Sequence, residues 1–170
     1  FRSDYNPGMD ADAPRFVADA MLGRLARWLR ILGYDVIYDP RADDRVIARI
    51  AARELRVVLT RDRGLLARRV VRRGILVGSE ELGAQLRQVR DALGLVFDPE
   101  RLFTRCSACN AEVEAATPAS VEGRVPPYVM RRHETFLRCP GCGRIYWGGS
   151  HRELARRRLK ELLGASGPSA

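Results

Sequence analysis

Short apolar runs alternate with stretches of helical periodicity over the first hundred residues. Between Met21 and Leu32, leucines recur at the intervals of one helix face, which predicts an amphipathic helix that ends at Gly33. Four short apolar runs predict strands, at residues 16–18, 36–38, 57–59 and 75–77. Further helices are expected from residue 43, over 65–74 and over 79–93.

Strands that alternate with helices form βαβ units, and such units build a parallel sheet. We therefore expect residues 15–97 to form an α/β domain in which helices flank a parallel sheet. From about residue 98 the regular alternation stops, and prolines and cysteine pairs replace it. Residues 98–163 are expected to form a second region that ends in a helix. The two ends, residues 1–14 and 164–170, are expected to be flexible.

The cysteines form two pairs of identical spacing, Cys106 with Cys109 and Cys139 with Cys142. Each Cys-x-x-Cys pair is typical of a zinc knuckle, and two knuckles supply the four thiolates of a closed tetrahedral site. The alternative is two disulfides, for which four cysteines allow three pairings. Because the first residues carry no apolar secretory segment, zinc is favoured. A zinc ion with all four positions filled would be structural and would not activate water.

The charge balance changes the picture by adding a candidate partner. Lys and Arg number 30 and Asp and Glu number 21, so the net charge is +9. A positively charged chain attracts polyanions and meets them faster, which makes nucleic acid a candidate. No stretch approaches the roughly 18 apolar residues of a membrane span. We therefore expect no membrane partner and a cytoplasmic location.

Carboxylates gather where the predicted strands end. Asp19 ends the first strand, Asp62 follows the third, and Asp43 and Asp44 begin the helix after the second. Parallel sheets bind ligands at the carboxyl ends of their strands. Carboxylate oxygens there could hold Mg²⁺ or Mn²⁺, which would neutralise a substrate phosphate and generate an attacking hydroxide. The alternative is that the acids at helix starts are only N-caps.

Four stretches of the chain carry a family resemblance. Residues 16–35, which read FVADAMLGRLARWLRILGYD, resemble the opening of the Mut-seven C-terminal RNase domain family. Members of that family are PIN-like domains with a fused zinc ribbon. The other stretches follow in the same order: LTRDR at 59–63, the first cysteine pair, and CPGCGRIYWGGSH at 139–151. Together they extend the resemblance over about residues 15–158.

The resemblance implies a fold and an activity. The fold would be a PIN-like α/β domain, with a parallel sheet flanked by helices and a C-terminal four-cysteine zinc ribbon. The activity would be that of a metal-dependent ribonuclease. Asp19, Asp44 and Asp62 would bind the catalytic Mg²⁺ or Mn²⁺, with Asp43 as an adjacent candidate. The zinc ribbon would support the structure and extend the surface that binds RNA.

Basic and aromatic residues near these motifs are candidates for RNA binding. The candidates are Arg24, Arg27, Arg30, Arg61, Arg63, Trp147, His151 and Arg157. Arginines could hold phosphates beside the metal, and aromatic rings could stack on unpaired bases. The alternatives are a solvated helix face for the arginines and packing over the ribbon for Trp147 and its neighbour Tyr146. For His151 the alternative is that its segment only caps the last helix.

Two other functions are compatible with the same residues. A non-catalytic module that binds RNA or the ribosome would use the basic surface and the ribbon but no metal at the acids. A toxin-like nuclease controlled by a regulatory protein is also possible, since PIN-like folds permit it. RNA cleavage uses both the positive charge and the acidic edge of the sheet. The sequence therefore predicts a metal-dependent ribonuclease.

Overall fold

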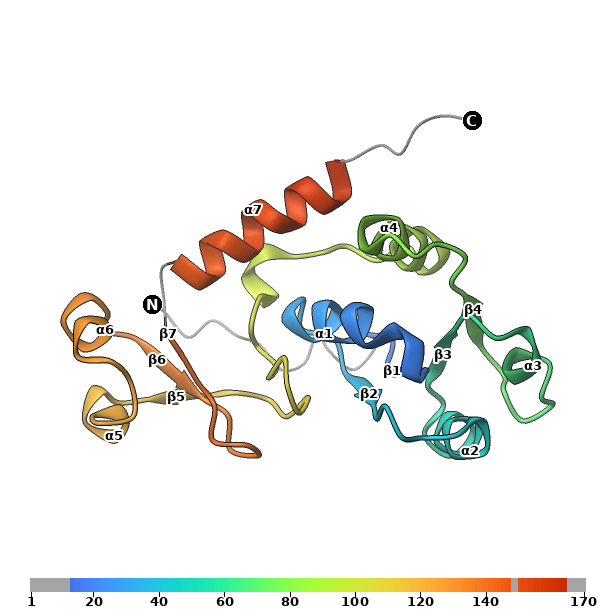
Figure 1. The fold of residues 1–170 in the computed structure, drawn as a ribbon, viewed down its shortest axis with the longest axis horizontal. Helices are drawn as coiled ribbons and strands as arrows, with labels where there is room; N and C mark the ends of the chain where they lie inside the picture. Colours follow the sequence, from blue (N-terminus) through green and yellow to red (C-terminus); the bar gives the residue numbers. More distant parts are fainter. Residues whose placement is uncertain (1–12, 148–149, 165–170) are drawn as a thin grey trace.

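Four short parallel strands form the main sheet of the computed structural model, which describes residues 13–147 and 150–164 (Figure 1). The strands are β1 (Phe16–Ala18), β2 (Val36–Tyr38), β3 (Val57–Thr60) and β4 (Gly74–Leu76). Their order is β2-β1-β3-β4, so the chain changes direction across the sheet between β1 and β3. Open α/β sheets bind ligands at such a point. The two ends of the chain were predicted to be flexible. Most of each end, residues 1–12 and 165–170, lies outside the described residues.

Helices cover both faces of this sheet, which confirms the predicted fold class. They are η2 (Ala20–Leu22), α1 (Gly23–Ile31), α2 (Asp44–Glu54), α3 (Arg63–Leu66) and α4 (Leu82–Leu93). Successive side chains of a strand point to opposite faces. Phe16 and Ala18 of β1 accordingly pack with α1 and α4, whereas Val17 between them packs with α2 and α3.

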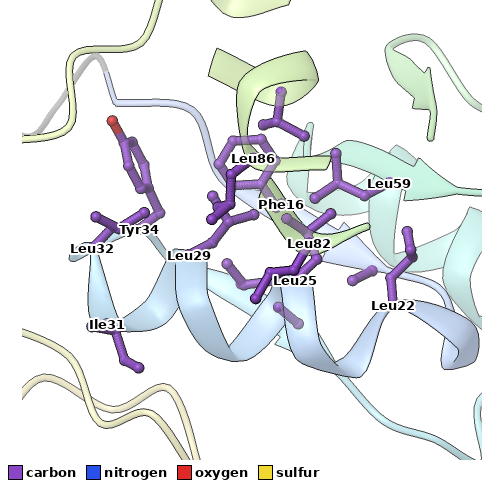
Figure 2. Packing of buried hydrophobic residues seen from close by; sticks show 14 of the residues in the cluster. Phe16, Leu22, Leu25, Leu29, Ile31, Leu32, Tyr34, Leu59, Leu82 and Leu86 are labelled. Atoms are coloured by element: carbon purple, nitrogen blue, oxygen red, sulfur yellow. The ribbon is translucent and has the colours of Figure 1, made fainter. Parts of the chain in front are cut away.

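The larger core lies between the sheet and helices α1 and α4. Leu25 and Leu29 of α1 are fully buried there and pack in one cluster with Phe16 and Leu86 (Figure 2). The ring of Tyr34 meets Phe16 edge-on, with a centroid separation of 5.9 Å. The leucine periodicity seen in the sequence is therefore the buried face of α1.

A smaller antiparallel sheet in the order β5-β6-β7 forms the ribbon, at one end of the molecule in Figure 1. Its strands are β5 (Glu114–Ala116), β6 (Phe136–Arg138) and β7 (Ile145–Trp147). The remaining helices are η3 (Pro99–Arg101), α5 (Pro118–Val121), α6 (Pro127–Arg132) and α7 (Ser150–Gly164). The ribbon has its own small core of four buried residues, Val121, Val125, Val129 and Phe136.

The last helix, α7, leaves the ribbon and packs on α4 (Figure 1). Leu159 and Leu162 are buried in the same cluster as the leucines of α1 and α4. The two helices approach closely at Gly83, where a Cβ atom would collide with the carbonyl oxygen of Leu162. Neither α7 nor any other helix of the described residues is long and apolar enough to cross a membrane.

The helix predicted over 65–74 is much shorter in the structure. It is α3, which ends at Leu66, and turns occupy the residues that follow it. A helix in a protein is stabilised mainly by burying an apolar face. Leu65 is fully buried, but Val70, which the predicted helix would place one turn after Leu66, is 52% exposed. The helical pattern therefore has too little buried surface to continue.

Candidate active site and zinc site

Two of the predicted acidic residues, Asp19 and Asp62, follow neighbouring strands and are linked through the hydroxyl of Thr60. Asp19 directly follows β1, and Thr60 is the fully buried last residue of β3. The Oγ1 of Thr60 donates to Asp19 Oδ2 at 2.8 Å and accepts from the backbone N–H of Asp62 at 2.9 Å. Thr60 therefore fixes the Asp19 carboxylate relative to the turn that carries Asp62.

Thr60 is a site residue that the sequence analysis did not identify. Only a weak signal was present in the sequence, because Thr60 follows the apolar run 57–59 and threonine is common in strands. A buried hydroxyl needs a hydrogen-bond partner, but the sequence does not show that this partner is a carboxylate 41 residues away.

Asp62 and Asp43 each cap a helix. Asp62 Oδ1 accepts from the backbone N–H of Gly64 at 2.6 Å, and Asp43 Oδ1 accepts from that of Val46 at 2.8 Å. These bonds satisfy amides that a helix leaves unpaired at its start. Asp43 thus has the role that the capping alternative gave it. Asp62 uses one oxygen in this way, and within the described residues its Oδ2 accepts no hydrogen bond.

Asp44 is the first residue of α2. Its Oδ2 is 3.6 Å from the Nη2 of Arg68. Within the described residues, the four cysteines are the one group of three or more His, Cys, Asp or Glu side chains that converges enough to hold an ion. Asp19, Asp44 and Asp62 therefore lie on the same edge of the sheet without forming a closed set of ligands.

Two of the arginines predicted to bind RNA line a small pocket near this edge. The pocket has a volume of about 90 Å³ and is bordered by η2, α1 and the residues that follow β3 and β4. Arg24 lines it and makes no hydrogen bond or ion pair within the described part of the chain. Arg61 lines it as well, and its Nη1 is 3.0 Å from Glu80 Oε1.

Arg30 is not available to RNA, which corrects the expectation for this residue. Its side chain faces inward from α1, and the residue is only 5% exposed. Its Nε donates to the carbonyl oxygen of Val36 at 2.9 Å, and its Nη1 donates to that of Ala108 at 2.7 Å. Arg30 thus joins α1 to the edge strand β2 and to the loop between the first two cysteines.

The other predicted RNA-binding residues are separate from the pocket. Arg27 and Arg63 are exposed on α1 and α3. Trp147 is partly buried against the ribbon core, so packing accounts for much of its ring. Arg157 is exposed on α7, with its Nε 4.0 Å from Glu153. The side chain of His151 lies outside the described residues.

The four cysteines converge on one point, as their spacing predicted. All four sulfur atoms lie within 4.8 Å of one another. Cys106 Sγ is 3.6 Å from Cys142 Sγ, and Cys109 Sγ is 3.2 Å from Cys139 Sγ. A disulfide needs a separation of about 2.05 Å, so the cysteines are free thiols. Thiolates held at about 2.3 Å from one tetrahedral zinc stand roughly 3.8 Å apart, and the cluster fits that ion.

The two knuckles have matching backbone turns. The residue after each pair has a left-handed conformation, with φ of 74° at Asn110 and 72° at Gly143. Their N–H groups donate back to the carbonyl oxygens of Cys106 at 3.0 Å and Cys139 at 2.9 Å. Glycine and asparagine adopt this conformation most readily, which explains why these types follow the cysteine pairs.

Tyr146 contacts the cysteine cluster through its hydroxyl. Its hydroxyl lies 3.1 Å from Cys106 Sγ and accepts from the N–H of Ser107 at 3.1 Å. Burial disfavours the thiolate of Cys106, but hydrogen bonds from Tyr146 and from backbone amides lower the pKa of Cys106 to about 6. Burial raises the pKa of Cys139 to about 12. Of these two thiols, Cys106 therefore forms a thiolate more readily.

Tyr146→Phe is expected to weaken zinc binding about tenfold, because outer hydrogen bonds to metal ligands typically contribute roughly 10–100-fold in affinity. The substitution removes the hydroxyl beside Cys106 and keeps the ring. Competition against a chromophoric zinc chelator measures the change. Tyr128→Phe is the matched control, since Tyr128 is exposed on α6. Equal zinc affinities for the two variants would contradict the assigned role of Tyr146.

The first knuckle docks on the open edge of β2 through a buried polar network. Asn110 Oδ1 accepts from the N–H of Val36 at 2.9 Å, and Asn110 Nδ2 donates to Asp35 Oδ1 at 2.7 Å. Arg56 donates to both oxygens of Asp35, at 2.7 and 2.9 Å. Burial favours the protonated acid, but the hydrogen bonds from Arg56 and Asn110 outweigh it and hold the pKa of Asp35 below its usual value. The ribbon thus covers an edge that would otherwise be unpaired.

Asp35→Ala is expected to lower the free energy of unfolding by about 3 kcal/mol, because the buried guanidinium of Arg56 would lose the carboxylate that its two Nη groups contact and keep only that of Glu54, at its Nε. Urea denaturation measures the loss. Asp91→Ala breaks the exposed pair with Arg90 and should cost less than about 1 kcal/mol.

The same pair gives an expected pH dependence. Because folding lowers the pKa of Asp35 from 3.8, its contribution is present above that pH and is lost as the pH falls through the folded value. The measurement is the free energy of unfolding of wild type and Asp35→Ala as the pH is lowered. If both proteins lose the same amount of stability in acid, Asp35 does not cause the pH dependence.

Comparison with known proteins gives one family. A family model described as the Mut7-C RNAse domain matches residues 14–159. The matched span contains the parallel sheet, the strand-end carboxylates and all four cysteines. Searches of the curated proteins and of the solved structures gave no match.

Proposed function

The chain belongs to the Mut7-C RNase domain family, and on that premise we propose that it is a metal-dependent ribonuclease that hydrolyses phosphodiester bonds of RNA. The observation that carries this proposal is the link that Thr60 makes between the Asp19 carboxylate and the backbone N–H of Asp62, at the turning point of the sheet. Asp19 and Asp62 follow adjacent parallel strands, and one buried hydroxyl bonds to both residues. Such a rigid arrangement suits residues that must hold a reacting group in place.

Asp19 and Asp62 are the main proposed ligands for Mg²⁺ or Mn²⁺. Mg²⁺ keeps several waters and usually binds through one or two carboxylates together with substrate phosphates, so a closed set of protein ligands is not required. Asp44, at the start of α2, is the proposed third ligand, and Asp43 is its capping neighbour. When bound, such an ion stabilises charge on the phosphate and lowers the pKa of a bound water.

Arg24 and Arg61 are proposed to bind phosphates of the substrate beside these carboxylates. Both line the pocket near η2, and Arg24 has a free guanidinium in the described structure. Arg61 is paired with the highly exposed Glu80, and an exposed pair of this kind is weak. A phosphate could therefore replace the carboxylate of Glu80. Arg27, Arg63, Trp147, His151 and Arg157 remain candidates for contacts farther along the RNA.

A non-catalytic RNA- or ribosome-binding module is the second candidate. It is favoured by one observation, which is that Asp19, Asp44 and Asp62 do not converge into a group of three ligands in the described residues. Such a module would bind RNA through its arginines with no ion at the acids.

Cleavage of a labelled single-stranded RNA separates the two candidates. The zinc-loaded protein is incubated with the RNA in Mg²⁺, in Mn²⁺, and without either ion. A ribonuclease should give shorter products only when one of these ions is present. RNA binding that persists in all three conditions, with no cleavage in any, would overturn the proposal and establish the module.

Thr60→Val is expected to lower the rate of cleavage by about tenfold, because supporting hydrogen bonds to metal ligands are worth roughly 10–100-fold. The change removes the donor to Asp19 and keeps the shape of a fully buried side chain. Thr60→Ser, which restores the hydroxyl, should recover most of the rate. The readouts are the rate of cleavage and the Mn²⁺ concentration that gives half-maximal cleavage, which should rise in Thr60→Val. If this concentration is the same in all three proteins, Thr60 does not position Asp19 for the ion.

A further inference from the structure

The positive charge of the chain is concentrated in one segment. Residues 41–73 contain eleven arginines and four carboxylates, a net charge of +7, whereas the whole chain has +9. The segment runs from just before α2 to just before β4. Most of the net charge therefore belongs to one side of the α/β unit, away from the ribbon (Figure 1).

Within this segment the structure forms an open groove of about 650 Å³ between α2 and the turns after α3. Four arginines line the groove, and they are Arg45, Arg49, Arg53 and Arg68. Ala48, Ala52 and Val70 supply its apolar surface. Val70 is 52% exposed, so the groove combines a charged rim with an apolar floor.

The arginines of α2 form a line along one face of the helix. Arg45, Arg49 and Arg53 follow one another at four-residue intervals, which places a positive charge about every 6 Å along the axis. Arg53 is paired with its neighbour Glu54. Arg45 and Arg49 have no acidic partner within the described residues. Unpaired charges in a row attract a polyanion with repeated charges.

The groove meets the candidate active site at one end. Arg68 contributes to its lining, and the Nη2 of Arg68 is 3.6 Å from Asp44 Oδ2 at the start of α2. The other end lies toward Arg53, nearly at the last residue of α2. A strand lying in the groove would therefore run along α2 and arrive at the carboxylates.

We propose that this groove binds the phosphate backbone of a single RNA strand and guides it to the strand-end carboxylates. The inference rests on the proposed ribonuclease function for its choice of polyanion. Phosphates would contact the arginine line, while riboses and unpaired bases would lie against the alanines and Val70. An unpaired strand offers such apolar faces, whereas a duplex presents mainly phosphates and sugars. An acidic protein would match the charge but has no reason for a regular spacing along α2.

The test is RNA affinity measured at several salt concentrations without Mg²⁺ or Mn²⁺, with a labelled oligouridylate as the probe. Arg45→Ala with Arg49→Ala should weaken binding at least tenfold near 0.1 M salt. The slope of the logarithm of the binding constant against the logarithm of the salt concentration should become shallower by about 1.4. Each phosphate contact of a single strand contributes about 0.7 to this slope, and the variant removes two arginines. Arg131→Ala with Arg132→Ala removes the same charge from α6, at the opposite end of Figure 1, and should change affinity less than twofold.

Other results would overturn the inference. Equal losses in the two double variants would mean that only total charge matters, and an unchanged affinity in the α2 variant would exclude the groove. Polyglutamate of the same length that competes as well as the RNA would assign the groove to an acidic protein. Because binding is measured without a catalytic ion, failure of the groove and failure of the ribonuclease proposal are independent. If the α2 variant cleaves RNA as fast as the wild type, the groove proposal is wrong and the ribonuclease proposal stands.

Discussion

Removal of zinc is expected to unfold the ribbon and to loosen the edge of the main sheet. The ribbon core consists of four buried residues, Val121, Val125, Val129 and Phe136. Such a core is too small to stabilise an independent unit without a metal. Structural zinc supplies about 10–16 kcal/mol of apparent binding energy to small zinc domains. Loss of the ion should therefore remove most of the folding energy of the ribbon.

The effect should extend to β2, because the first knuckle satisfies the backbone of that strand. Asn110 accepts from the N–H of Val36, and Arg30 bridges the carbonyl oxygens of Val36 and Ala108. When the knuckle is disordered, the N–H of Val36 loses its partner. Hydrogen exchange at that amide should become much faster after chelation, whereas the central strand β1 should change little.

Cys106→Ser tests the same dependence without a chelator. It should lower the melting temperature of the ribbon, and added Zn²⁺ should not restore it, because one thiolate is missing from the tetrahedral set. Ser107→Ala is the matched control, since it changes the same knuckle and keeps all four thiols. Exchange at Val36 that is the same with and without zinc would contradict the coupling between ribbon and sheet.

The second large effect is expected for Asp19→Asn, which should lower the rate of RNA cleavage by about 100-fold or more. Even an outer hydrogen bond to a metal ligand is worth roughly 10–100-fold, and loss of a ligand charge should cost at least as much. The asparagine oxygen can still accept from Thr60 Oγ1, so the fold should be retained. The measurement is kcat for a labelled RNA in saturating Mn²⁺.

Asp39→Asn is the matched control for this variant. Asp39 follows β2 at the same edge of the sheet and is exposed, and its Oδ1 accepts from the N–H of Arg41. The control should keep nearly all of the activity, because Asp39 does not contact Thr60. An Asp19→Asn, Asp62→Asn double variant should lose little more than the first change alone, since ligands of one ion act as a unit. Wild-type cleavage by the double variant would remove the basis of the proposed mechanism.

Features that depend on neighbours in the sequence were largely predictable. The strands of the parallel sheet and the helices α1, α2 and α4 follow from apolar periodicity, which is a local property. The zinc knuckles follow from the spacing of the cysteines, because two residues between them bring both thiols to one side of a tight turn. Even here, the helix after Asp62 was overestimated, since its pattern did not reveal how little of it is buried.

Contacts between distant segments could not be predicted in the same way. Arg30 looks like one more surface arginine of an amphipathic helix, and only the approach of Ala108, 78 residues later, shows that it is buried and bonded. Thr60 gains its importance from a carboxylate on another strand. The line of arginines on α2 is visible in the sequence, but it becomes the wall of a groove only because Arg68 and Val70 lie opposite.

The sequence by itself therefore determined the elements, the zinc ligands and the family, because periodicity and spacing act over a few residues. The tertiary structure decided which charges are buried, which side chain holds the Asp19 carboxylate, and where the net charge of +9 forms a surface. The physical reason is that desolvation and hydrogen bonding depend on which groups meet in space. For Arg30, Thr60 and Asn110, those partners lie 41 to 78 residues away.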